Sequence, residues 1–117
     1  MYHFASELEQ MADQLKRICA TLFEEKTTLS QPLIHAFEDM LALLENLYNH
    51  FYRIGHIDSS ALRNQRNVVF DEVYALFHHK KLRGPELEIA SLMLSVLCCV
   101  KEIETETIAQ LCINNNL

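Results

Sequence analysis

The sequence has few of the residues that end short strands and tight turns. Its 117 residues include only 2 Gly, 2 Pro and no Trp. A sandwich or barrel of many short strands needs turn residues at regular intervals, so this composition excludes one. The chain also lacks the low hydropathy of a disordered protein, because half of its residues are apolar. We expect one domain over residues 1–117, since a single core commonly serves about 100–200 residues.

The chain has no surplus of positive charge. Ten Lys and Arg residues face 16 Asp and Glu residues, for a formal charge of −6. A nucleic-acid binder uses a basic surplus to neutralise phosphates, so we expect no nucleic-acid partner. The longest apolar run, residues 87–100, is interrupted by Glu88, Ser91 and Ser95. A bilayer span needs about 20 apolar residues, so we expect no membrane association.

No leader and no disulfide framework are visible. The first residues show no basic region followed by an apolar stretch, so we expect no secretory signal peptide. The four cysteines, Cys19, Cys98, Cys99 and Cys112, have no CxxC spacing, and two of them are adjacent. Buried thiols in a reducing compartment fit this pattern, so we expect a cytoplasmic protein.

Apolar residues recur every three or four positions, which is typical of amphipathic helices. The pattern predicts helices at about 6–25, 30–53 and 59–82, and a fourth that begins at Pro85. Ser6 and Glu9 match a capping box, while Ser30, Gly55 and Gly84 mark the corners. Short links make neighbouring helices antiparallel. The fold class is therefore all-α, an antiparallel four-helix bundle, in which residues 106–113 either form a short fifth helix or continue the fourth.

The fourth helix is apolar on nearly all sides. Its polar residues Glu88, Ser91, Ser95 and Glu102 cluster in one narrow stripe. A helix that faces one core needs an apolar stripe only a little over 100° wide. Either the last segment folds over this helix, or its exposed back forms a homodimer or partner interface. We favour the interface, and its predicted contact residues are Leu92, Met93, Val96, Cys99 and Val100.

No catalytic or metal-binding motif is present. Di-iron bundles carry Glu-x-x-His, which this sequence lacks, and His35 and Glu38 lie on the polar side of their helix. The adjacent His78 and His79 point about 100° apart and cannot chelate one ion together. We expect no metal and no cofactor, although a metal- or cofactor-binding bundle stays open as an alternative function.

The cysteines do not suggest a nucleophile. Cys98 and Cys99 lie among aliphatic residues, where a thiolate is disfavoured, and Cys19 lies on the apolar seam of its helix. The chain has no glycine-rich phosphate loop, nucleophile elbow or His-Glu-x-x-His. The sequence therefore predicts a protein that is not an enzyme.

Three groups of residues suggest contacts. A basic cluster either stabilises a helix C-terminus or meets an acidic partner; it comprises His78, His79, Lys80, Lys81 and Arg83. Arg66 falls on an apolar seam, so its stem should be buried and its head should be paired or reach water. Arg66, Arg63 and the basic cluster could together contact a nucleic acid, so a nucleic-acid-associated regulator is a further alternative function. Tyr48, Phe51 and Tyr52 are either core residues or interface hot spots.

Two stretches prompt a whole-chain resemblance: SQPLIHAFEDMLALLENLYNHF and GPELEIASLMLSVLCCV. The chain resembles small all-helical regulatory proteins with which intracellular pathogenic bacteria restrain their own secreted effector enzymes. The resemblance implies an inhibitor of a paired effector, such as a ubiquitin-modifying deamidase or transglutaminase-like enzyme, and delivery to the host cytosol. It carries over no functional residue. We therefore expect a non-enzymatic protein-binding module that forms a homodimer and regulates a partner enzyme.

Overall fold

The computed structural model of the chain describes residues 2–24, 29–52, 59–79, 82 and 84–115. They form four helices, α1 (Tyr2–Glu24), α2 (Gln31–Tyr52), α3 (Ser59–His79) and α4 (Pro85–Asn115). These residues contain no β-strand. The all-α, four-helix prediction is confirmed.

The helix ends agree with the sequence at the start of α4 and differ from it at the starts of α1 and α2. α1 begins at Tyr2, so Ser6 and Glu9 lie inside the helix and the predicted capping box is wrong. At the start of α2, the Ile34 amide donates to the Ser30 carbonyl at 3.1 Å, so Ser30 occupies the N-cap position. Its Oγ is buried without a hydrogen-bond partner among the described residues, so the side-chain cap that the sequence predicted is not formed. Gly84 has φ +57, the left-handed conformation that glycine adopts readily, and Pro85 is the first residue of α4. Gly55 lies outside the described residues.

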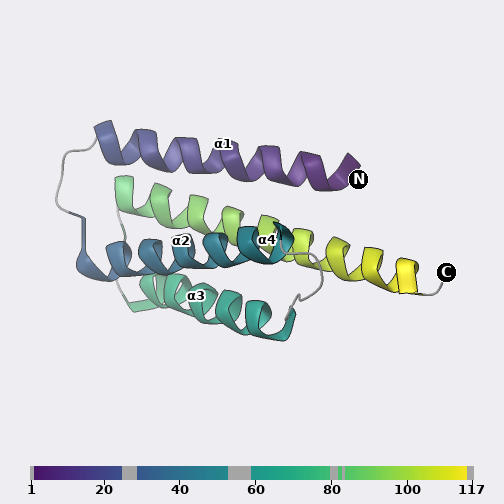
Figure 1. The fold of residues 1–117 in the computed structure, drawn as a ribbon. Helices are drawn as coiled ribbons and strands as arrows, with labels where there is room; N and C mark the ends of the chain where they lie inside the picture. The colour runs from purple at the N-terminus through teal and green to yellow at the C-terminus, as the bar shows by residue number, and fades with distance from the viewer. Residues whose placement is uncertain (1, 25–28, 53–58, 80–81, 83, 116–117) are drawn as a thin grey trace.

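The helices alternate in direction, and α4 is the central one (Figure 1). α1 and α3 run antiparallel to α2 and α4, so α1 begins and α4 ends at the same end of the molecule. α4 packs against all three other helices, and α2 also packs against α3. Within the described ranges no Cα of α1 lies within 8 Å of α2 or α3. α1 is thus held mainly by α4.

α4 gives the molecule its length. It has 31 residues, which at 1.5 Å per residue is about 46 Å. The radius of gyration is 15.5 Å, above the about 13 Å expected for a compact domain of this size. The helix does not break at Thr105, whose hydroxyl donates to the Lys101 carbonyl at 2.9 Å. A separate fifth helix over residues 106–113 is therefore not formed, and the fourth helix continues.

The core surrounds α4, which overturns the predicted contact surface. Leu92, Met93, Val96, Cys99 and Val100 are all buried within the chain's own fold. Leu92, Met93, Val96 and Val100 belong to one core cluster with residues of the other helices: Ile18, Leu33, Met40, Leu43, Val69 and Val73. The interface prediction assumed that three neighbouring helices leave an apolar back uncovered. They cover it instead, and the exposed side of α4 holds the polar stripe with Ser91 and Glu102.

Among the described residues, no helix contains a stretch that is both long enough and apolar enough to cross a bilayer.

Candidate functional site

With the α4 face buried, the exposed apolar side chains of α2 are the strongest candidate for a contact surface. Five residues recur at three- and four-residue steps along α2, and we call them the α2 stripe: Ile34, Phe37, Leu41, Leu44 and Tyr48. Leu41 is 44% exposed and Tyr48 is 62% exposed, while the other three are half-buried. The interpretation of Tyr48 as a core residue is wrong, and the side chains of Phe51 and Tyr52 lie outside the description.

The opposite flank of α2 faces α3. Asn46 donates through Nδ2 to Oε1 of Gln65 on α3 at 2.7 Å. Asp39, on the same flank as Asn46, is hydrogen-bonded to Glu72 of α3. Because α3 occupies this flank and the core occupies the middle of the helix, the α2 stripe lies on the flank away from α3. α1 does not approach α2 closely, so its backbone does not cover the stripe.

The apolar seam of α1 is only partly covered. Ile18 is buried, whereas Leu8 is 40% exposed. Phe23, next to the seam residue Leu22, lies off the seam and is 80% exposed. One helix neighbour buries a narrower stripe than two would, which explains the partial cover. Cys19 is exposed, so its predicted place on the buried seam is wrong.

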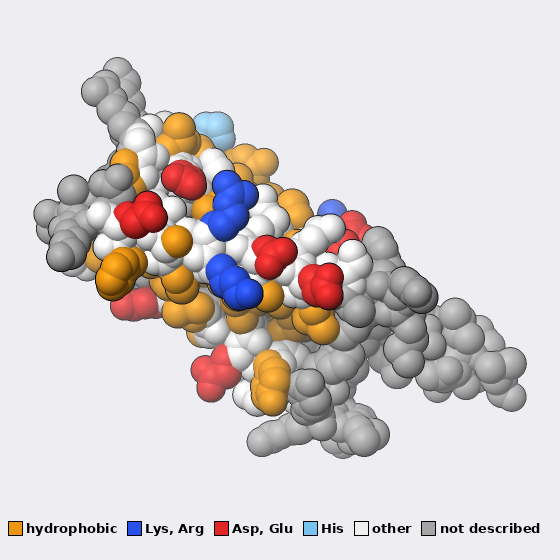
Figure 2. Space-filling view, turned by 90° about the horizontal axis from the view of Figure 1, so that it is seen from above, with side chains coloured by type: hydrophobic (Ala, Val, Ile, Leu, Met, Phe, Trp, Pro, Cys, Tyr) orange, Lys and Arg blue, Asp and Glu red, His pale blue; other side chains and the backbone are white. Residues whose placement is uncertain are grey.

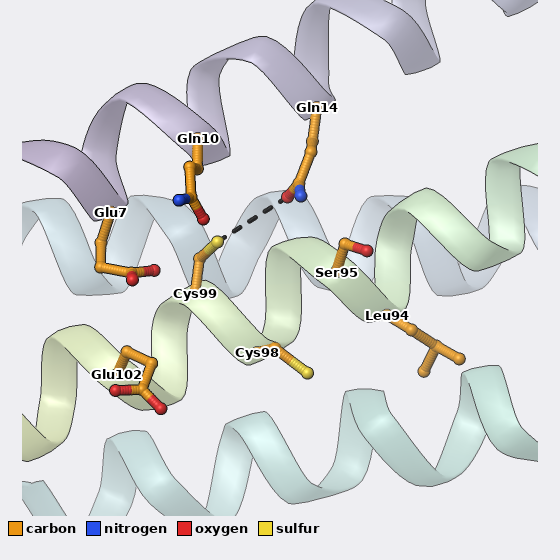
Figure 3. A pocket seen from close by; sticks show the side chains of 8 residues that line it. All are labelled: Glu7, Gln10, Gln14, Leu94, Ser95, Cys98, Cys99 and Glu102. Atoms are coloured by element: carbon orange, nitrogen blue, oxygen red, sulfur yellow. Dashed lines mark hydrogen bonds between the residues drawn. The ribbon is translucent and has the colours of Figure 1, made fainter.

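α1 and α4 together line an open groove of about 540 Å³ (Figure 3). Its walls combine polar and apolar side chains: Glu7, Gln10 and Gln14 from α1, and Leu94, Ser95, Cys98, Cys99 and Glu102 from α4. The Cys99 thiol donates to Oε1 of Gln14 at 3.7 Å. Burial, and then the Glu7 carboxylate beside it, raise the pKa of Cys99 to about 11. Its sulfur is therefore protonated at neutral pH, as expected for a thiol among aliphatic residues.

Cys98 and Cys99 should differ in reactivity although they are adjacent. Cys98 is exposed, and Cys99 is buried with a pKa of about 11. A rise from 9 to 11 lowers the thiolate fraction about 100-fold, and burial slows attack further. We expect iodoacetamide at pH 8 to alkylate Cys98 at least ten times faster than Cys99, measured by peptide mass mapping. Equal rates would contradict this assignment, and denatured protein is the control.

An ion pair joins α3 to α4 inside the protein. Arg66 donates through Nη1 to Oε2 of Glu104, and both side chains are largely buried, at 12% and 6% exposed. Burial raises the pKa of Glu104, while Arg66 and Arg63 act to lower it. Glu104 Oε1 is buried without a hydrogen-bond partner among the described residues. The expectation that the Arg66 head is paired is confirmed, and this guanidinium is engaged rather than open to a phosphate.

The predicted basic cluster falls mostly outside the description. His78 is exposed, and its ring stacks against Tyr74 with centroids 6.1 Å apart. The His79 side chain, Lys80, Lys81 and Arg83 lie outside the described residues. On the face seen in Figure 2, acidic and basic side chains are interspersed with apolar ones. That face carries no patch of one charge sign among its described residues, which gives no support to the nucleic-acid alternative.

A cluster of metal-ligating side chains links α2 and α3. His35 and Asp39 are four residues apart on α2, with Nε2 and Oδ2 3.4 Å apart. Glu72 of α3 joins them, so that one ligand atom from each lies within 4.8 Å of the others. Burial, the hydrogen bond to Asp39 and its negative charge raise the pKa of Glu72 to about 7, while His35 acts to lower it. His35 and Glu38 face solvent as predicted.

The cluster of His35, Asp39 and Glu72 was not predicted from the sequence. The four-residue spacing of His35 and Asp39 is visible in the sequence and is a ligand spacing for helical metal sites. Glu72 could not be assigned to them without the register between α2 and α3. The three- and four-residue spacing of the α2 stripe is also visible in the sequence, but α4 has more apolar residues and so was the predicted contact surface.

No family model, no curated protein and no solved structure matches this chain.

Proposed function

We propose that this protein is a non-enzymatic helical module that binds a partner enzyme and inhibits or regulates it. The observation that carries the proposal is the α2 stripe, in which Leu41 and Tyr48 are exposed at helical spacing. Apolar side chains that stay exposed along one side of a helix favour a protein contact over a solvated surface. Tyr48 belongs to a residue type that is enriched in interface hot spots.

Charge next to the α2 stripe defines the partner surface. Glu38 and Glu45 are exposed and border the stripe on its solvent side. The whole chain carries a formal charge of −6. An amphipathic helix of the partner, with basic residues beside its apolar face, would complement both features. The resemblance described above gives the first candidates, ubiquitin-modifying deamidases and transglutaminase-like effector enzymes.

The proposal includes a cytoplasmic location. Cys19 and Cys98 are free, exposed thiols. Free surface thiols persist in reducing compartments, which supports this part of the proposal. A homodimer would use the same α2 stripe, so self-association and partner binding compete for one surface.

The experiment is a binding and inhibition assay with purified candidate enzymes. Leu41→Ala combined with Tyr48→Ala removes both exposed anchors. Each hot-spot truncation costs more than about 1 kcal/mol, so we expect the double variant to bind at least about 30-fold more weakly while its helical circular dichroism is unchanged. Val68→Ala is the matched control, because Val68 is 57% exposed but lies on α3.

Light scattering shows whether the α2 stripe binds a second copy of the chain or a partner enzyme. A concentration-dependent dimer that Leu41→Ala and Tyr48→Ala convert to monomer assigns the stripe to self-association. A monomer that neither binds nor inhibits any enzyme of the panel contradicts the proposal. Equal loss of binding in Val68→Ala would contradict the assignment of the contact to α2.

A further inference from the structure

We infer that His35, Asp39 and Glu72 form a site for a divalent transition-metal ion, such as Zn²⁺ or Mn²⁺, that bridges α2 and α3. The inference does not depend on the proposed function. The site lies on the flank of α2 that faces α3, and the α2 stripe lies on the other flank.

The geometry of the two α2 ligands fits chelation by one ion. Residues four apart on a helix lie one above the other on the same face. The 3.4 Å between His35 Nε2 and Asp39 Oδ2 equals the ligand–ligand separation in a tetrahedral zinc site with bonds of about 2.0–2.1 Å. No rearrangement of α2 is needed for both atoms to reach one metal.

The third ligand comes from another helix and needs only a small movement. The chosen atoms of all three residues already lie within 4.8 Å of one another. Glu72 is half-buried, which holds its carboxylate toward α2, and a rotation of this flexible side chain shortens the remaining gap. A metal here would tie α2 to α3 beside the Asn46–Gln65 hydrogen bond.

The donor set selects the class of metal. One imidazole nitrogen and two carboxylate oxygens suit Zn²⁺, Mn²⁺ and related ions, whereas soft ions prefer thiolates. Two carboxylates balance the charge of a divalent cation, and a dication between them replaces their mutual repulsion with attraction. The His35 side chain is 69% exposed, so water can complete the coordination shell.

The experiment titrates the full chain with Zn²⁺ alone, followed by calorimetry and by the shift in thermal unfolding temperature. We expect one site, at least tenfold weaker in Glu72→Gln and in His35→Gln. Glu38→Gln is the matched control, because it removes one negative charge from α2 at an exposed position beside the cluster. It should keep the wild-type affinity, and circular dichroism checks that every variant is folded.

Co²⁺ used as a second probe separates this site from the cysteines. Binding at His35, Asp39 and Glu72 gives ligand-field bands without a thiolate charge-transfer band. A thiolate band would place the metal at a cysteine and overturn the inference. Undetectable binding to the wild-type chain, or equal affinity in Glu72→Gln, would also overturn it. None of these results bears on enzyme binding by the α2 stripe, which is measured in the separate binding assay described above.

Discussion

Replacing Arg66 with alanine is expected to lower the free energy of unfolding by about 3 kcal/mol at neutral pH. The substitution leaves the Glu104 carboxylate inside the protein without its opposite charge, and that carboxylate is 6% exposed. Glu104 Oε1 already lacks a hydrogen-bond partner among the described residues, so there is little local compensation. Urea unfolding followed by circular dichroism measures the loss.

The pH dependence identifies the charge as the cause. Burial raises the folded-state pKa of Glu104, and without Arg66 nothing as close would lower it. A carboxyl with a raised folded-state pKa is stabilising below its unfolded pKa, and this contribution is lost as pH rises through the folded-state value. The deficit of Arg66→Ala should therefore be largest at neutral pH and should shrink toward pH 4. A deficit that is equal at both pH values would contradict the assignment.

Two variants control for the loss of side-chain volume and charge. Lys16→Ala removes one positive charge from an exposed position on α1 and should change the free energy of unfolding by less than about 0.5 kcal/mol. Arg66→Met combined with Glu104→Leu removes both charges and fills the space. Because apolar replacement of a buried pair is often neutral or stabilising, the double variant should recover most of the lost stability.

Met93→Ala should destabilise the protein by about 3 kcal/mol, within the range of about 2–5 kcal/mol for large-to-small changes in cores. Met93 is fully buried at the centre of the bundle. The loss combines the transfer free energy of the removed atoms with the cavity that they leave. Thermal and urea unfolding both measure it.

This substitution also distinguishes the core from the contact surface that the sequence predicted. Leu87→Ala is the control, because Leu87 is on the same helix and is 43% exposed; it should cost less than 1 kcal/mol, about the scale of surface changes. If Met93→Ala left stability unchanged and abolished enzyme binding, the buried position of α4 would be wrong.

The sequence was sufficient to predict the four helices because their signals are local. Three- and four-residue steps, Ser30 before α2 and Gly84-Pro85 before α4 each depend on neighbours along the chain. The capping box at Ser6 failed because α1 extends four residues further toward the N-terminus. A short polar motif matches a cap equally well whether or not an earlier turn of helix precedes it.

The place of α4 could not be deduced from its own residues. Its apolar excess correctly showed that the helix must be surrounded, but the pattern does not say by what. The prediction assumed that three neighbouring helices would leave one side of α4 open. The three other helices instead pack around it, and only its polar stripe and its neighbours face solvent.

The candidate sites depended on pairings between helices. Arg66 was recognisable as a charge on an apolar seam, but its partner Glu104 lies 38 residues away. His35 and Asp39 were recognisable as a helical pair, but Glu72 joins them only through the packing of α2 on α3. Sequence periodicity shows which residues share a face of one helix. It contains no information on how two packed helices are aligned along their lengths.

Because α1 packs only against α4 among the described helices, it can affect how cooperatively the protein unfolds. α2, α3 and α4 all contact one another, whereas α1 has a single interface with that unit. Local opening of a protein requires the loss of the contacts that hold the opening segment. For α1 these contacts form one interface, the most extensive between any two helices described. Its loss would leave the other three helices paired and would uncover the side of α4 that carries Cys99.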